Sequence, residues 1–263
     1  MPFARIGDAA VHYREAGGGS DVVLLLHAFP LSSSMWEPQL RGLAGRFRVL
    51  APDYRGLGLS RPAPPATTMS LAASDALALL RSLGVRRASV AGVSMGGYVA
   101  FELYRKAPEL FRALALCDTR SAPDTVEARA NREIYARNAL EKGLGWVADD
   151  FVPRLLRPSP DPEVAARVRA IVEEGTPEGV AAAQRGMALR KDSVPTLSRI
   201  TCPAAVILGE EDQITPLADA RTMQAGIPGA RLHVIPGAGH LPNLEAPDAF
   251  NRAISSLFAA APA

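Results

Sequence analysis

The stretch VAGVSMGGYVAF, residues 90–101, sets one serine among glycines at the end of a short apolar run. Residues 88–92 have the pattern of a buried strand, and residues 95–106 have that of a helix that stops before Pro108. A G-x-S-x-G pattern between a strand and a helix predicts a very tight turn that strains the backbone at Ser94 and exposes its hydroxyl group. The alternative is a glycine-rich turn with an incidental serine, but the strand–turn–helix context favours Ser94 as a nucleophile.

Further strand-like runs alternate with helical patterns on both sides of this stretch. They lack a strict two-residue alternation of polarity, which is typical of parallel strands that are covered on both faces. Two weaker and more polar runs, 2–6 and 10–15, predict an antiparallel start. The chain is therefore expected to form an α/β fold around a mostly parallel eight-stranded sheet with helices on both faces. The stronger strand-like runs are 22–27, 47–52, 88–92, 112–118, 204–209 and 231–236.

Local signals predict where the helices begin and end. The pattern SLAASDALALLRSLGV begins with Ser70 as a helix cap and closes at Gly84. The final pattern, PDAFNRAISSLFAA, predicts a helix with one apolar stripe. The residues of that stripe are Phe250, Ile254, Leu257 and Phe258.

Residues 120–198 contain no convincing strand pattern, only about four helix patterns. Two of these begin with Pro162 and Pro177, each followed by a glutamate, as is common in a first helical turn. An insertion at the carboxyl end of a strand would lie over the edge where open α/β sheets bind ligands. We therefore expect a core domain of residues 1–119 and 199–263 and a helical cap, or lid, of residues 120–198.

Composition restricts the kinds of partner. The 263 residues carry a net charge of only +2, which argues against a nucleic-acid-binding protein. The longest apolar run, residues 22–29, is too short to cross a bilayer, and residues 1–19 have no signal-peptide pattern, so a cytoplasmic protein without a membrane partner is expected. Cys117 and Cys202 are expected to be buried reduced thiols, and no Cys/His spacing suggests a metal site.

A serine nucleophile needs a base and an acid that orients the base. Of the four histidines, His240 lies in a glycine-rich loop after the last strand pattern, where a side chain can reach across a cleft. His12 and His233 lie within strand patterns and are expected to be structural. The acid should follow a strand and precede the histidine in the chain, which favours Asp212, with Asp118 as the second candidate.

An oxyanion formed at the serine would need two hydrogen-bond donors. One is the N–H group of Met95, the residue after Ser94. The second is expected in the loop HAFPLSSSMW, at the N–H group of Phe29. Pro30 restricts the turn there, and His27 is expected to brace this loop by hydrogen bonding.

Taken together, these motifs resemble the α/β-hydrolase superfamily over essentially the whole chain. The order is HAFP (27–30), DYRGLGLS (53–60), GVSMGG (92–97), GEEDQITP (209–216) and GAGHLPNLEAP (237–247). More closely, the chain is similar to bacterial short-chain carboxylesterases and to 3-oxoadipate enol-lactonase-like hydrolases. The resemblance implies a Ser94–His240–Asp212 triad, a helical cap, and ester hydrolysis without a cofactor. Ala28 and Leu57 depart from the glycine and histidine that are usual in the family.

The expected activity is that of a serine carboxylesterase acting on short- to medium-chain esters, small molecules that fit an apolar pocket. Possible pocket residues are Leu31, Trp146 and Phe151, together with Phe29 and Met95; Trp36 is also a possible contributor. An enol-lactonase is the alternative, and its carboxylate substrate would require an arginine. Further alternatives are a cofactor-free perhydrolase side activity and a non-catalytic ligand receptor on the same scaffold. The arginines available for an enol-lactone are Arg55, Arg120, Arg129 and Arg154.

Overall fold

The computed structural model describes residues 2–261 and forms an eight-stranded sheet in the order β1-β2-β4-β3-β5-β6-β7-β8. The β1–β2 and β2–β4 pairs are antiparallel, whereas all neighbours from β4 to β8 are parallel. The mostly parallel sheet predicted from the sequence is thus confirmed. The strands are β1 (Phe3–Ile6), β2 (Ala9–Ala16), β3 (Val22–Leu26), β4 (Arg48–Pro52), β5 (Ala88–Val93), β6 (Phe111–Cys117), β7 (Ala204–Gly209) and β8 (Arg231–Ile235).

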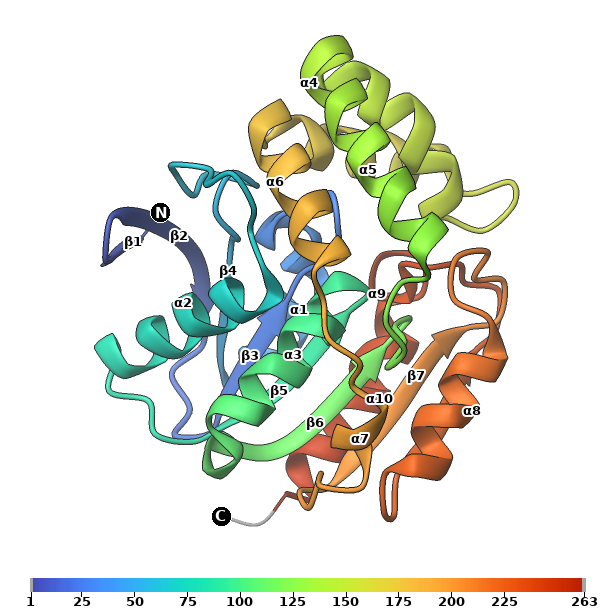
Figure 1. Cartoon of the computed structure of the whole chain (residues 1–263). Coiled ribbons are helices and arrows are strands. Elements are labelled where there is room, and N and C mark those ends of the chain that lie inside the picture. The colour runs from blue at the N-terminus through green and yellow to red at the C-terminus, as the bar shows by residue number, and fades with distance from the viewer. Residues whose placement is uncertain (1, 262–263) are drawn as a thin grey trace.

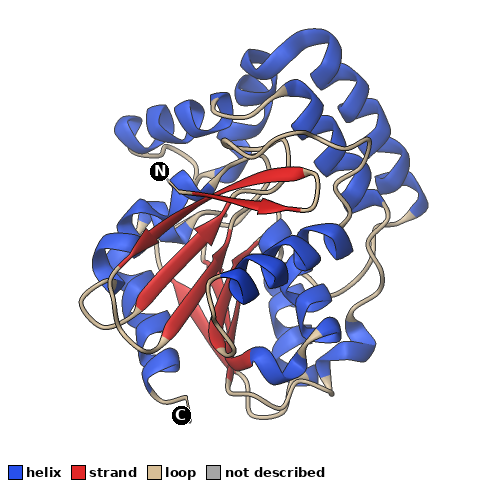
Figure 2. Cartoon of the chain, turned by 90° about the vertical axis from the view of Figure 1, so that its left-hand side faces the viewer, coloured by secondary structure: helices blue, strands red, loops and turns tan. Residues whose placement is uncertain are grey.

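Helices cover both faces of the sheet (Figures 1 and 2). In Figure 1, α2, α3 and α8 lie in front of the strands, and α1 and α10 lie behind them. Every residue of β3, β5 and β7 is buried, which explains their apolar sequences without alternation. The helices of this layer are α1 (Glu37–Leu43), α2 (Met69–Ser82), α3 (Met95–Lys106), α8 (Leu217–Gly226), α9 (Pro242–Glu245) and α10 (Pro247–Ala259), with short turns η1 (Ser33–Trp36), η2 (Pro108–Leu110) and α7 (Val194–Leu197).

The start of α2 corrects one prediction. The cap is Thr68 and not Ser70, because the backbone of Thr68 is extended and its hydroxyl oxygen accepts a hydrogen bond from the Leu71 N–H group at 3.1 Å. The helix ends at Ser82, and Gly84 follows with a left-handed φ of 71°, as predicted. Prediction of the helix was therefore right, but its cap lies two residues earlier.

The segment between β6 and β7 is helical, as predicted, with α4 (Val126–Leu155), α5 (Pro162–Glu173) and α6 (Pro177–Ala188). Gly143, with φ 76° and ψ −177°, divides α4 into two helical parts, so the insertion contains four helical segments before α7. This helical cap lies above the carboxyl ends of the parallel strands (Figure 1). It is fastened to the loop after β4, where the Thr176 hydroxyl and N–H groups both donate to the Gly56 carbonyl oxygen at 3.0 and 3.1 Å.

Neither cysteine forms a disulfide. Cys117 is buried, as expected, but Cys202 is only half-buried, because it lies before β7 rather than within it. Burial raises the pKa of the Cys202 thiol to about 11. None of the helices in residues 2–261 has both the length and the apolar character that crossing a membrane would require.

Candidate active site

Ser94 occupies the turn between β5 and α3 with φ 54° and ψ −114°, a backbone conformation that is uncommon for any residue other than glycine. The turn is possible because glycine occupies the positions two residues before and after Ser94: a Cβ atom on Gly96 would lie 2.0 Å from the carbonyl oxygen of Leu26. Ser94 itself is half-buried. The sequence motif therefore produces the strained, accessible serine that it predicts.

Residues at the tip of β6 hold this turn in place. The Ser94 N–H group donates to the Cys117 carbonyl oxygen at 2.9 Å, and the Thr119 hydroxyl donates to the Ser94 carbonyl oxygen at 2.7 Å. These contacts fix the backbone of the serine, while its hydroxyl group remains at the carboxyl edge of the sheet.

His240 and Asp212 form a buried hydrogen-bonded pair at the same edge, with 2.8 Å between Nδ1 and Oδ2. The other carboxylate oxygen of Asp212 accepts hydrogen bonds from the N–H groups of Ile214 and Thr215 at 2.8 and 3.1 Å. Burial acts to raise the pKa of Asp212, but the charge and hydrogen bond of His240 and these two N–H groups outweigh it, so the pKa lies below its usual value. Asp212 is therefore ionised at neutral pH.

The second candidate acid, Asp118, lies beside this pair. One ligand atom from each of Asp118, Asp212 and His240 lies within 4.8 Å of the other two. Because Cys117 binds Ser94 and the next residue, Asp118, lies near His240, the serine and the histidine face the same edge of the sheet. Among residues 2–261 no hydrogen bond joins the Ser94 hydroxyl to His240; catalytic groups often make that contact only when substrate is bound.

The loop that carries His240 depends on a residue that the sequence analysis missed. Glu245 accepts hydrogen bonds from the N–H groups of Gly239 at 2.7 Å and Arg157 at 2.9 Å. Arg157 follows the last helix turn of α4, so Glu245 joins the histidine loop to the helical cap. Nothing in the sequence pattern distinguishes this glutamate, because its two partners are backbone groups far apart in the chain.

The loop after β3 is braced by His27, as predicted. The imidazole Nε2 accepts from the Tyr54 N–H group at 3.1 Å, which leaves Nδ1 as the donor to the Ala28 carbonyl oxygen at 2.9 Å. Burial lowers the pKa of His27, so the ring is neutral. The hydrogen bonds within residues 2–261 leave the Phe29 N–H group unused, and the Met95 N–H group lies at the first position of α3, where a helix has no internal partner for it.

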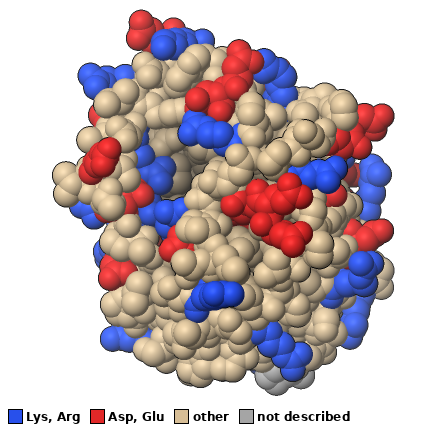
Figure 3. Space-filling view, turned by 90° about the vertical axis from the view of Figure 1, so that its right-hand side faces the viewer, with Lys and Arg blue, Asp and Glu red and all other residues tan. Residues whose placement is uncertain are grey.

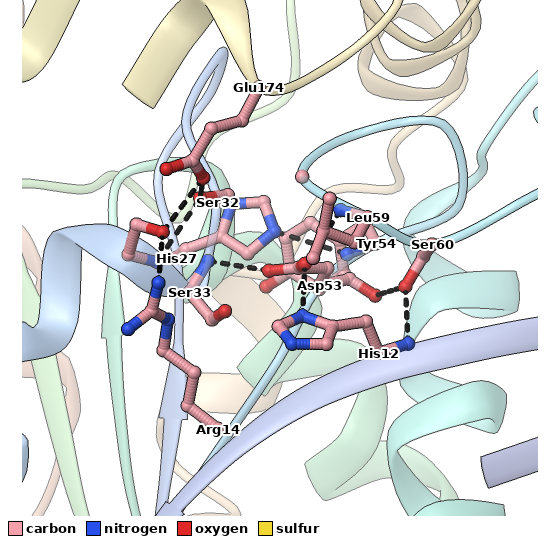
Figure 4. A network of polar contacts seen from close by, with 12 residues as sticks. His12, Arg14, His27, Ser32, Ser33, Asp53, Tyr54, Leu59, Ser60 and Glu174 are labelled. Carbon is pink, nitrogen blue, oxygen red and sulfur yellow. Dashed lines mark hydrogen bonds and ion pairs between the residues drawn. The ribbon is translucent and has the colours of Figure 1, made fainter. Parts of the chain in front are cut away.

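A buried network behind this loop centres on Asp53 (Figure 4). The carboxylate accepts hydrogen bonds from the N–H groups of Ser33 at 2.6 Å and Leu59 at 2.9 Å, and it lies 2.7 Å from His12 Nδ1. Burial opposes ionisation of Asp53, but the His12 hydrogen bond and the N–H groups of Leu59 and Ser33 favour the carboxylate, and the pKa of Asp53 is lowered. His12 is structural, as predicted, and Asp53 holds the loop next to Phe29.

The helical cap reaches the same loop through Glu174, at the end of α5. One oxygen of Glu174 accepts from the hydroxyl groups of Ser32 at 2.5 Å and Ser34 at 2.7 Å, and Arg14 also donates to Ser34 (Figure 4). We call this contact the Glu174 latch. The sequence does not predict this contact, because Glu174 lies more than 100 residues from both serines along the chain.

The structure divides the predicted pocket residues. Trp36 is fully buried against Phe250, with 6.0 Å between ring centroids, and so belongs to the core. Phe29 instead meets the cap residue Phe151 edge-on at 5.1 Å, and Leu31 is buried beside this loop. Tyr135, which the sequence analysis missed, completes an aromatic cluster of Phe29, Tyr135, Trp146 and Phe151.

Most of the arginines proposed for a carboxylate substrate have acidic partners. Arg55 binds Asp75 and Asp8, Arg120 pairs with Asp219, and Arg154 pairs with Asp150. Arg129 is exposed on α4. Figure 3, which shows the right-hand side of the molecule as seen in Figure 1, has a hollow with both basic and acidic side chains near it.

The fold and this site define a hydrolase of the α/β class. Residues 23–253 match the family described as the alpha/beta hydrolase family, and the chain belongs to that family.

Individual relatives are esterases and lactonases. The structure is similar, with a TM-score of 0.92, to a thermophilic esterase from Thermogutta terrifontis solved with malate bound, at 40% identity over 96% of this chain and 94% of that one. The enol-lactonase from Burkholderia xenovorans is 30% identical, with a TM-score of 0.89 and coverage of 98% and 100%. The 3-oxoadipate enol-lactonase 2 of Acinetobacter baylyi is 28% identical over 95% of this chain and 93% of that protein.

Proposed function

We propose that the protein is a serine carboxylesterase that hydrolyses short- to medium-chain esters through an acyl-enzyme. The observation that carries the proposal is the strained Ser94 turn, with φ 54°, at the same sheet edge as the buried His240–Asp212 pair. A strained serine turn of this kind exposes a hydroxyl group, and an oriented imidazole supplies the base that the hydroxyl needs. The 40% identity with the esterase from Thermogutta terrifontis supports the same class of substrate.

In the proposed reaction, His240 Nε2 accepts the Ser94 proton as Oγ attacks the ester carbonyl carbon. Asp212 holds Nδ1 protonated and stabilises the imidazolium that forms, while remaining ionised itself. The N–H groups of Phe29 and Met95 stabilise the oxyanion. His240 then protonates the departing alcohol, and water, activated by His240, releases the acid from Ser94.

The aromatic cluster favours a substrate with an apolar acyl or alcohol group. The backbone N–H group of Phe29 is the proposed oxyanion donor, and the ring of Phe29 contacts Phe151 of the helical cap. A bound ester would therefore lie between the core and the cap. Residues 120–198 would then act as a lid held by the Glu174 latch and by Glu245. No cofactor or metal is required by this chemistry.

An enol-lactonase is the second candidate, because the relatives from Burkholderia xenovorans and Acinetobacter baylyi carry that name. It is ranked second because Arg55, Arg120 and Arg154 are already paired with carboxylates. A perhydrolase side activity and a ligand receptor remain further alternatives of the same site.

The test is Ser94→Ala with a series of chromogenic esters and lactones and a serine-directed phosphonate probe. We expect the parent to be labelled at Ser94 and kcat/KM for short esters to fall by about three orders of magnitude or more in the variant. The exposed Ser256→Ala variant is the control and should behave like the parent. Full activity of Ser94→Ala would exclude the mechanism, labelling without turnover would indicate a receptor, and preference for lactones would favour the second candidate.

A further inference from the structure

Asp118 leaves a buried oxygen atom unsatisfied beside the proposed catalytic acid. The residue follows β6 with a left-handed φ of 45° and is 1% exposed. Its Oδ1 atom accepts a hydrogen bond from the Gly209 N–H group at 2.7 Å, whereas Oδ2 is buried and has no donor among the described residues. A buried polar atom without a partner is costly, so a reason for it must lie nearby.

The nearest polar groups explain which kind of partner Oδ2 requires. One carboxylate oxygen of Asp118, one of Asp212 and one ring nitrogen of His240 lie within 4.8 Å of one another. Asp212 already accepts hydrogen bonds from His240 and from two N–H groups. These hydrogen bonds stabilise the ionised form of Asp212. Two buried carboxylates at this distance do not both keep a negative charge, and the one with fewer donors takes up the proton.

We propose that Asp118 is a neutral carboxylic acid that donates a hydrogen bond from Oδ2 to the Asp212 carboxylate and so acts as a positioning residue for the His240–Asp212 pair. The proposal rests on the proposed function, since it assigns Asp212 as the acid that orients His240. Asp118 keeps its proton throughout turnover, while His240 gains and loses the serine proton.

The surroundings of Asp118 support this assignment. Burial and then the charge of Asp212 raise the pKa of Asp118 well above its usual value, whereas the Gly209 N–H group acts in the opposite direction. Apart from Asp212 and His240, the titratable groups that act on Asp118 are the Cys117 thiol and Glu245, and neither is a cation. Arg120 is turned toward the Ile214 carbonyl oxygen and Asp219 instead.

Asp118 also connects the loop that carries Asp212 to the turn that carries Ser94. Its carbonyl oxygen accepts from the Thr215 hydroxyl at 3.2 Å, in the loop that carries Asp212. Its chain neighbours Cys117 and Thr119 bind the Ser94 backbone. A hydrogen bond from Asp118 to Asp212 therefore connects the acid to the turn that carries the nucleophile.

The consequence for catalysis is electrostatic. A second negative charge next to Asp212 would stabilise the imidazolium form of His240 before substrate binds, and a protonated imidazole is not a base. A neutral Asp118 orients Asp212 without adding that charge. An asparagine can do the same, because its amide N–H₂ donates where the acid O–H group would and its carbonyl oxygen can accept from Gly209.

The test compares Asp118→Asn with Asp118→Ala, using kcat and KM for a chromogenic short ester across pH. We expect Asp118→Asn to stay within about threefold of the parent, and Asp118→Ala to lose about 10- to 100-fold in kcat with little change in KM, the loss typical of a hydrogen bond to a charged group. The acid limb of the kcat/KM profile should keep its position in Asp118→Asn. Asp248→Asn, at an exposed carboxylate in the first turn of α10, is the matched control.

Two results would overturn the proposal: an Asp118→Asn variant as impaired as Asp118→Ala, which would require a charged carboxylate, or full activity in both. An infrared measurement on the unmodified protein does not depend on activity or on the folding of Asp118→Ala. A protonated carboxyl band at neutral pH that disappears in Asp118→Asn supports the proposal, and its absence overturns it. If the Ser94 mechanism failed instead, activity would be unaffected by Ser94→Ala while the infrared band would remain.

Discussion

Two buried aspartates at strand ends, Asp53 after β4 and Asp118 after β6, have opposite electrostatic states. Asp53 is 2% exposed and accepts two N–H groups in addition to its contact with His12, and its pKa is lowered. Asp118 is equally buried but has one donor and a carboxylate neighbour, and its pKa is raised. The difference teaches that burial alone does not decide the charge of a carboxyl group; the number of donors that reach it does.

The largest expected effect in this comparison concerns stability. Asp53→Asn would remove the negative charge beside His12 and place an N–H₂ group against the N–H group of either Ser33 or Leu59, so the free energy of unfolding should fall by about 3 kcal/mol or more. Urea unfolding at pH 7 measures it, with the exposed Asp149→Asn variant as the control. A loss no greater than that of the control would show that Asp53 is not needed as an anion.

The second prediction concerns the pH dependence of stability at Asp118. Because its folded pKa is raised, the folded state keeps a proton that the unfolded chain releases above about pH 4, so stability falls with pH by up to about 1.4 kcal/mol per unit until the folded pKa is reached. Asp118→Asn removes this slope and should therefore be more stable than the parent at pH 7.

Asp53 provides the contrasting sign. Its lowered pKa contributes stability that is present above about pH 4 and is lost as the pH falls through the folded pKa. Unfolding curves between pH 3 and pH 8 separate the two residues. A parent and an Asp118→Asn variant with the same slope would contradict the assigned protonation state.

A smaller effect is expected at the Glu174 latch. Glu174→Gln weakens two hydrogen bonds from Ser32 and Ser34 to a charged acceptor, so the free energy of unfolding should fall by about 1–2 kcal/mol and kcat/KM for esters by several-fold. The neighbouring Glu173→Gln is the matched control, since within residues 2–261 the only ion pair or hydrogen bond of the Glu173 side chain is with Arg169, at 3.9 Å. Equal behaviour of the two variants would mean that the latch does not hold the loop after β3.

The smallest effect is expected at an exposed carboxylate. Glu133 pairs with Arg185 between α4 and α6 on the surface, and water and salt screen such a pair. Glu133→Ala should change the free energy of unfolding by about 0.5 kcal/mol or less, and the change should shrink at high salt. A loss comparable to that of Asp53→Asn would remove the distinction between buried and exposed carboxylates.

Particular residues show which features of the structure could be predicted from local sequence signals. The Ser94 turn, the parallel strands and the helical insertion could be predicted because each depends on glycine placement, apolar runs or helix caps within a few residues. Thr68 and Ser70 illustrate the limit: both residue types are acceptable caps, and the structure begins α2 after Thr68. Trp36 could have lined the pocket or the core, and large aromatic side chains are more often found in the core. The structure places it in the core, because side-chain direction depends on elements that are distant in sequence.

By itself the sequence determined an α/β sheet with a strained serine turn, because strand, turn and helix signals are local and follow from backbone geometry. It also proposed His240 and Asp212, but not the contact of 2.8 Å between them. Only the tertiary structure decided the charge of Asp53 and Asp118, the Glu174 latch and the Glu245 contact with the cap. Hydrogen bonds and pKa values depend on which groups meet in space, and many of these groups come from different elements that are separated along the chain.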